Sequence, residues 1–301
     1  MPVSHIDYHH HPAFFQHLIS LMPTEPDYSR ETEFSKLLTR ATDIDLQRVA
    51  LEIARDEYPE LDVEEYLVWF DAVAATLKPR VSTCPTELDV LKLICQELSE
   101  ERGFSGNSEA FRDTRCSYLN RVIDTGRGLP ITLSLVYMGI AQRLGINLQG
   151  VASPMHFVCQ LQTFQGPVYL DAFTNGRILS EEECLKWLKR VSELPEDVIL
   201  RSLVPTDSRL IVMRMLNNLK SLFAQHENWR SLWKVQHRLS AMQPGNWHEQ
   251  RDLGMVSLQA GRPGRAVEIL NACLKNCQDE NDRDAMQHAI GQARSLLAGM
   301  N

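Results

Sequence analysis

The sequence predicts an α+β fold, in which a mainly helical core carries a small antiparallel sheet and a purely helical array follows. Three observations lead to this prediction. Apolar residues recur at helical spacing from residue 31 to residue 98. Short apolar segments bounded by turn residues follow between residues 148 and 170. Every segment after Pro205 has helical spacing again. Helices that precede strands are typical of α+β proteins, whereas α/β proteins alternate the two.

The first third of the chain is predicted to form four helices. Helical spacing begins at Glu31, Asp45 is placed to cap a second helix, and a third helix spans about 62–77. Thr86 is placed to cap the fourth helix. Such N-cap side chains accept a hydrogen bond from a free backbone N–H of the first turn. We therefore expect an array of capped helices before the glycines near residue 103.

A long apolar helix is expected at the centre of this region. It begins at Pro130, runs to about Leu144 and ends at Gly145. Proline suits the first helical position because its missing N–H would have no partner there. The helix is apolar on nearly all sides, which is typical of a helix buried inside a domain.

The strand candidates form one antiparallel meander. They span residues 148–152, 156–161 and 167–170, with turns at Ser153-Pro154 and Gln165-Gly166. A further helix is expected to begin near Ser180.

The last hundred residues resemble tetratricopeptide repeats. Leu253-Gly254, Gly261, Ala266 and Leu270 match the small and apolar positions of this 34-residue unit. We therefore expect helical hairpins over residues 206–301. Stacked helical pairs form concave surfaces that bind proteins or peptides. Three tryptophans are candidate anchors for a partner, and packing between helices is the alternative: Trp229, Trp233 and Trp247.

Composition narrows the classes of function. Of the 301 residues 44% are hydrophobic and 23% are charged, and the formal net charge is −8. An acidic chain without clustered basic residues binds nucleic-acid backbones poorly. No signal-peptide pattern opens the chain, and no apolar run reaches the roughly 18 residues of a membrane helix. Seven scattered cysteines without a C-x-x-C pair indicate reduced thiols. We expect a cytoplasmic protein without cofactor, bound metal, nucleic acid or membrane partner.

Residues 1–28 are predicted to be a loosely ordered tail, because Pro12, Pro23 and Pro26 interrupt the segment and apolar residues are sparse. Its five histidines make transition-metal binding the alternative: His5, His9, His10, His11 and His17. The predicted domains are thus 1–28, 29–205 and 206–301.

Five stretches in the middle of the chain carry a family resemblance. They lie at residues 118–122, 127–134, 143–146, 154–157 and 170–176. Together and in this order they resemble the SirB-type branch of the transglutaminase-like superfamily. The resemblance implies that residues 29–205 form a transglutaminase-like domain, with a core of the papain-like cysteine-protease type.

Active members of this superfamily use a Cys-His-Asp triad, and the resemblance implies where its positions lie. Counted back from Gly145, the cysteine position falls on Pro130, while His156 and Asp171 match the other two. A helix N-terminus stabilises a thiolate, the imidazole takes its proton and the carboxylate orients the imidazole. Proline offers neither a nucleophile nor an N–H for an oxyanion. The triad is therefore predicted to lack its nucleophile.

Two functions from different classes follow. The first is a non-catalytic scaffold of the cytosol that binds proteins through its repeats and retains His156 and Asp171 as a structural pair. The second is a hydrolase or acyltransferase that combines this pair with Thr132, Ser134 or Cys116. Four polar residues near the motifs either line a pocket or bond turn backbone: Asn120, Arg127, Thr132 and Asn175.

Overall fold

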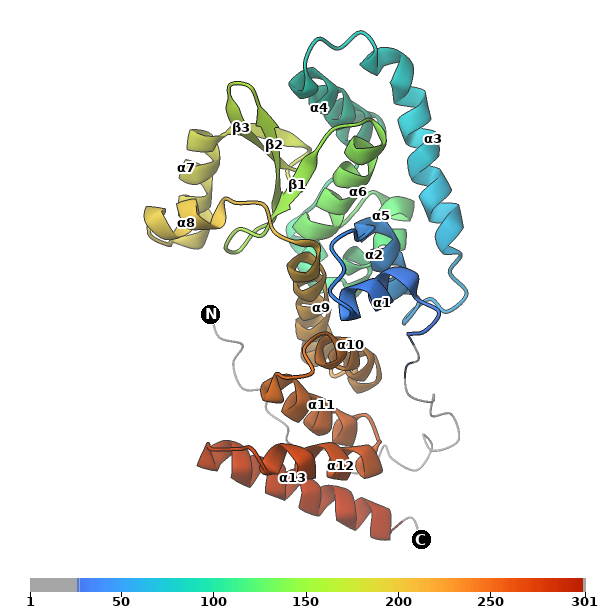
Figure 1. The fold of residues 1–301 in the computed structure, drawn as a ribbon, viewed down its shortest axis with the longest axis vertical. Helices are drawn as coiled ribbons and strands as arrows, with labels where there is room; N and C mark the ends of the chain where they lie inside the picture. Colours follow the sequence, from blue (N-terminus) through green and yellow to red (C-terminus); the bar gives the residue numbers. More distant parts are fainter. Residues whose placement is uncertain (1–25, 27, 300–301) are drawn as a thin grey trace. The chain divides into compact units, whose positions relative to one another are not determined.

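A computed structural model describes residue 26 and residues 28–299 of the chain (Figure 1). The chain divides into two compact units. Residues 31–215 form the first unit. The second contains residues 216–299 together with the described residues up to Arg30. The division falls inside one helix, later than the predicted boundary after Pro205. All five histidines of the predicted tail fall within residues 1–25, which lie outside the described residues.

The first unit begins with the four predicted helices. These are α1 (Thr32–Leu38), α2 (Leu46–Ala54), α3 (Val63–Val81) and α4 (Glu87–Cys95). Asp45 and Thr86 cap α2 and α4 as predicted, because they accept hydrogen bonds from the backbone N–H groups of Arg48 and Asp89. A π-helical turn (Gln96–Glu101), two 3-10 turns (Ser108–Arg112 and Thr114–Ser117) and α5 (Leu119–Thr125) follow.

Helix α6 (Pro130–Arg143) lies at the centre of this unit, as its sequence predicts. It packs against α2, α3, α4 and α5, and also against two strands of the sheet. Leu133, Val136 and Tyr137 have no exposed surface. Pro130 is the first helical residue. The start of α6 is therefore fixed inside the unit from several sides.

The sheet contains the predicted meander and one further strand. Its strands are β1 (Leu148–Val151), β2 (Val158–Thr163), β3 (Gly166–Asp171) and β4 (Arg177–Ser180), antiparallel in this order. Strand β4 was not predicted, because it is short and lacks a clear apolar alternation. Helix α7 (Glu181–Ser192) then begins with Ser180 as its N-cap, as predicted, and α8 (Glu196–Ser202) follows.

Both faces of the sheet are buried within the first unit. Cys159 of β2 contacts the Ser134 carbonyl of α6, 3.9 Å from its Sγ. Its neighbour Val158 packs with Tyr169 on the side of α7 and α8. Neighbouring residues of a strand point to opposite faces, so the sheet lies between α6 and the α7–α8 pair. This burial holds the strand ends that carry the candidate site.

The second unit consists of helical hairpins. The helices are α9 (Ser208–Gln225), which starts in the first unit, α10 (Trp229–Met242), α11 (Trp247–Gln259), α12 (Pro263–Leu274) and α13 (Glu280–Ala298). Asn228, Asn246 and Asp279 cap α10, α11 and α13 through their side chains.

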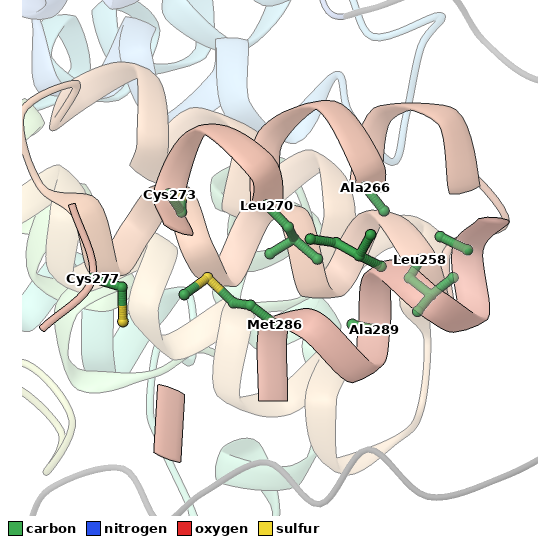
Figure 2. Packing of buried hydrophobic residues seen from close by; sticks show 9 residues of the cluster. Leu258, Ala266, Leu270, Cys273, Cys277, Met286 and Ala289 are labelled. Atoms are coloured by element: carbon green, nitrogen blue, oxygen red, sulfur yellow. The ribbon is translucent and has the colours of Figure 1, made fainter. Parts of the chain in front are cut away.

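The repeat-like residues have the packing roles that the sequence predicts. Ala266 has no exposed surface and lies in the cluster shown in Figure 2, together with Leu258, Leu270 and Met286. A Cβ on Gly254 would meet Leu270 at 2.6 Å, so α11 and α12 are in close contact there. Gly261 turns the chain between them with a φ of +74°, a left-handed conformation that suits glycine.

Candidate functional site

The imidazole of His156 and the carboxylate of Asp171 are hydrogen-bonded. His156 ends the turn between β1 and β2, and Asp171 is the last residue of β3. Nε2 of His156 lies 2.9 Å from Oδ1 of Asp171. Asp171 has no exposed surface and His156 is 8% exposed. The pairing expected from the motif order is thus present.

Two further groups bind the Asp171 carboxylate. The backbone N–H of Thr174 donates to Oδ1 at 3.3 Å. Nη2 of Arg177, which lies opposite Asp171 in the β3–β4 register, approaches Oδ2 at 3.4 Å. Burial alone would raise the pKa of Asp171, but the interactions with His156 and Thr174 outweigh it and the pKa is lowered. Asp171 is therefore an anionic acceptor that orients His156.

Aromatic rings enclose the His156 imidazole. Trp187 of α7 makes an edge-to-face contact with it, with ring centroids 4.7 Å apart, and Phe173 makes another at 5.8 Å. Arg177 lies over the Trp187 ring at 4.9 Å. These contacts restrict the motion of the His156 ring. They also restrict Arg177, which binds the same Asp171 carboxylate as His156.

Thr132 has its hydroxyl committed to the start of α6. Its Oγ1 accepts a hydrogen bond from the backbone N–H of Leu129 at 2.9 Å. The same hydroxyl donates to the carbonyl of Cys116 at 2.7 Å. Thr132 therefore closes the first turn of α6 and is not poised as a nucleophile.

The other two candidate nucleophiles are also buried. Ser134 has no exposed surface, and among the described residues its hydroxyl has no hydrogen-bond partner. Cys116 is 7% exposed, and burial raises the pKa of its thiol. Its carbonyl accepts from Leu129 N–H at 3.1 Å, which places its backbone beside the start of α6. Within the described part of the chain, no hydroxyl or thiol is hydrogen-bonded to the His156 ring.

The remaining pocket candidates are not brought together by any hydrogen bond between described residues. Asn120 is buried on α5, and its Oδ1 has no partner there. Arg127 is exposed and pairs through its backbone with Ser105. Asn175 is exposed in a turn with a φ of +51°. Proximity to the motifs in sequence did not predict where these side chains point.

The candidate anchor tryptophans of the second unit differ in exposure. Trp233 is 3% exposed, donates to Ser257 Oγ at 3.1 Å and lies under Arg262. Trp233 thus packs between helices, the alternative role given for the three tryptophans, and is not an exposed anchor. Trp229 and Trp247 are half-buried.

Three residues around His156 were missed by sequence reasoning. Arg177 and Trp187 surround the pair directly. Arg214 donates to the backbone carbonyls of Ser153 and His156 from the start of α9. Every residue has a backbone carbonyl, so the sequence does not indicate which carbonyls Arg214 binds.

Two family models match the chain. The transglutaminase-like superfamily matches residues 64–217, about half of the chain. The tetratricopeptide repeat matches residues 219–291. No solved structure gave a significant match.

Curated bacterial proteins are similar over most of their length. A UPF0162 protein of Xylella fastidiosa is 33% identical over 76% of this chain and 83% of its own. Protein SirB1 of Salmonella typhimurium is 21% identical over 77% of this chain and 85% of its own. The UPF0162 protein YchA of Escherichia coli is 23% identical with the same coverage.

Within residues 26 and 28–299, none of the helices is both long and apolar enough to cross a membrane. In the same part of the chain, no group of three or more His, Cys, Asp or Glu side chains is arranged to hold a metal ion.

Proposed function

Because this chain belongs to the SirB-type family of the transglutaminase-like superfamily and carries tetratricopeptide repeats, we propose that it is a non-catalytic scaffold that binds proteins in the cytosol. The transglutaminase-like unit supplies a rigid body in this proposal, and the repeat helices supply the binding surface.

The observation that carries the proposal is Pro130 at the first position of α6. Acyl transfer from an amide needs a strong nucleophile where the helix start stabilises its anion. Pro130 has none. Thr132 uses its hydroxyl to close the helix turn, and Ser134 lies buried further along the helix. The His156–Asp171 pair then acts as a structural tie between the β1–β2 turn and the end of β3.

Two further observations support the location and the partner class. All seven cysteines are free thiols, which suits a reducing compartment. Helical repeats expose a large surface relative to their core, and their stacked hairpins suit a protein or peptide partner. The net charge of −8 argues against nucleic acid as that partner.

Site-specific photo-crosslinking in cells tests the proposal. A photoreactive amino acid is placed at an exposed repeat position, His248 or Gln292, and at exposed Val68 of the transglutaminase-like unit as the matched control. We expect defined protein adducts from the repeat positions and none from Val68. Adducts from Val68 alone, or none from any repeat position, would contradict the proposal.

The alternative is a hydrolase or acyltransferase in which Cys116 serves the His156–Asp171 pair. Its support is the backbone contact of Cys116 with the start of α6. Its difficulty is the thiol itself, because burial raises the Cys116 pKa and lowers the fraction of thiolate. Cysteine-labelling kinetics separate the two proposals.

A further inference from the structure

Arg214 of α9 is a partly buried cation with an unusual set of partners. Its Nη1 donates to the Ser153 carbonyl at 2.9 Å and its Nη2 to the His156 carbonyl at 2.7 Å. The guanidinium also lies 5.8 Å from the centre of the Phe157 ring. Among the described residues no carboxylate forms an ion pair with it, and burial lowers its pKa without an opposing acidic group. A desolvated guanidinium without a counter-ion is unfavourable unless its hydrogen bonds compensate.

The two carbonyls that Arg214 binds belong to the ends of one tight turn. Ser153 and His156 enclose Pro154 and Met155, and the Ser153 hydroxyl donates across the turn to the His156 carbonyl at 3.0 Å. Met155 has a φ of +59° and its side chain is 71% exposed. A left-handed residue with a Cβ is sterically unfavourable and persists only where its surroundings hold it.

This turn determines where the His156 imidazole lies. His156 is its last residue, and its ring reaches Asp171 from there. A guanidinium is a planar fork that can hold two acceptors at fixed spacing, which a lysine ammonium cannot do with the same geometry. Two charge-assisted hydrogen bonds to the ends of the turn thus oppose the unfavourable conformation of Met155.

We propose that Arg214 is the positioning residue of the His156–Asp171 pair: its guanidinium fixes the turn so that the imidazole stays against the carboxylate. The role is independent of whether the pair catalyses a reaction. The hydrogen bonds of Arg214 go to backbone carbonyls and not to the His156 ring or to Asp171.

Proton NMR of the full-length protein tests this role. The imidazole N–H that is hydrogen-bonded to Asp171 should give a low-field resonance, assigned by its loss in His156→Gln. We expect Arg214→Met and Arg214→Lys to shift or broaden this resonance while far-UV circular dichroism stays unchanged. Arg214→Lys keeps the charge and decides the question if Arg214→Met does not fold.

Arg209→Met is the matched control. Arg209 lies on the same helix, and its Nη1 donates to the Leu37 carbonyl at 2.6 Å, a backbone acceptor outside the turn. Its loss should lower thermal stability and leave the His156 resonance in place. An unchanged resonance in folded Arg214→Lys would overturn the proposal, as would an equal change in Arg209→Met.

Heating of the wild-type protein gives a second test, once the His156 resonance has been assigned. On heating, the resonances of the hydrogen-bonded guanidinium protons of Arg214 and of the His156 ring proton should broaden over the same temperature range. If the guanidinium protons exchange freely while the His156 resonance persists, Arg214 does not position the pair.

Discussion

Asp171 is the residue around which the candidate site is organised, since His156, Thr174 and Arg177 all converge on its carboxylate. Its pKa is lowered from an ordinary value of 3.8. The folded state therefore binds the proton more weakly than the unfolded state does. The resulting stability is fully present above pH 3.8 and is lost as the pH falls below that value toward the folded pKa.

We predict that Asp171→Asn removes this part of the pH dependence. Near neutral pH the variant should lose about 2 kcal/mol of unfolding free energy, because a buried charged hydrogen-bond network is weakened. Its loss of stability as the pH falls below about 4 should be smaller than that of the wild type. Urea unfolding at several pH values measures both effects.

Asp113→Asn is the control for this experiment. Asp113 also has a lowered pKa, through Arg115, but its side chain is 33% exposed. Solvent-exposed ion pairs contribute little to stability, so Asp113→Asn should change the unfolding free energy by less than about 1 kcal/mol. Equal effects at Asp113 and Asp171 would argue against a special role for the buried carboxylate.

Pro130 carries a second prediction at the scale of one residue. If it occupies the nucleophile position, Pro130→Cys places a thiol at the α6 N-terminus, where the helix dipole and His156 favour the thiolate. This thiol should react with iodoacetamide faster than any native cysteine, and more slowly after His156→Ala. Ile131→Cys, one residue further along the helix, should show no such dependence.

A thiol in Pro130→Cys that reacts no faster than half-exposed Cys84 would mean that Pro130 lies outside the nucleophile position. Mass spectrometry of the labelled peptide gives the rate at each cysteine separately.

The sequence predicts the pair but not its surroundings. His156 and Asp171 stand at motif positions, and their spacing leads to the hydrogen bond that the structure contains. Arg214 follows His156 by 58 residues and binds a backbone carbonyl, an acceptor that every residue possesses. The orientation of Arg127 and Asn175 depends on turn geometry, which their types do not determine.

At the scale of elements, local signals predicted most helices and failed for one strand. Asp45, Thr86 and Ser180 cap helices where their side chains can reach a free N–H, and Pro130 begins α6. These interactions lie within four residues, so they can be read from the sequence. Strand β4 forms because its backbone pairs with β3. The residue types of β4 alone do not predict this pairing.

The packing of α11 against α12 gives a prediction at this scale. Ala266→Leu adds volume at a fully buried contact and should cost roughly 1–3 kcal/mol of unfolding free energy. Gly254→Ala should destabilise as well, because its Cβ would meet Leu270 at 2.6 Å. Chemical denaturation of the full-length variants, monitored by tryptophan fluorescence, measures both losses of unfolding free energy.

Gly291→Ala is the opposite control. Gly291 lies within α13, and a Cβ there would meet nothing within 4 Å. Alanine should therefore stabilise the helix by roughly 0.5–1 kcal/mol. Loss of stability in this variant, or none in Ala266→Leu, would contradict the repeat packing.

At the scale of the whole molecule, the chain combines a transglutaminase-like unit with a helical repeat unit, and α9 contributes residues to both. The order of motifs predicted this combination because each unit has its own sequence pattern. A partner of the proposed scaffold does not follow from the sequence in the same way, since the exposed residues of the repeats follow no pattern fixed by the fold.

We propose that no cysteine of this protein acts as a catalytic nucleophile. Cysteine-specific labelling of purified wild-type protein with an iodoacetamide probe, followed by mass spectrometry, tests it most directly. Slow labelling spread over several thiols and unaffected by His156→Ala is the predicted result, because burial raises the pKa of Cys95, Cys116, Cys159, Cys184 and Cys273. Fast, pH-dependent labelling of a single cysteine, Cys116 above all, that is lost in His156→Ala would contradict the claim.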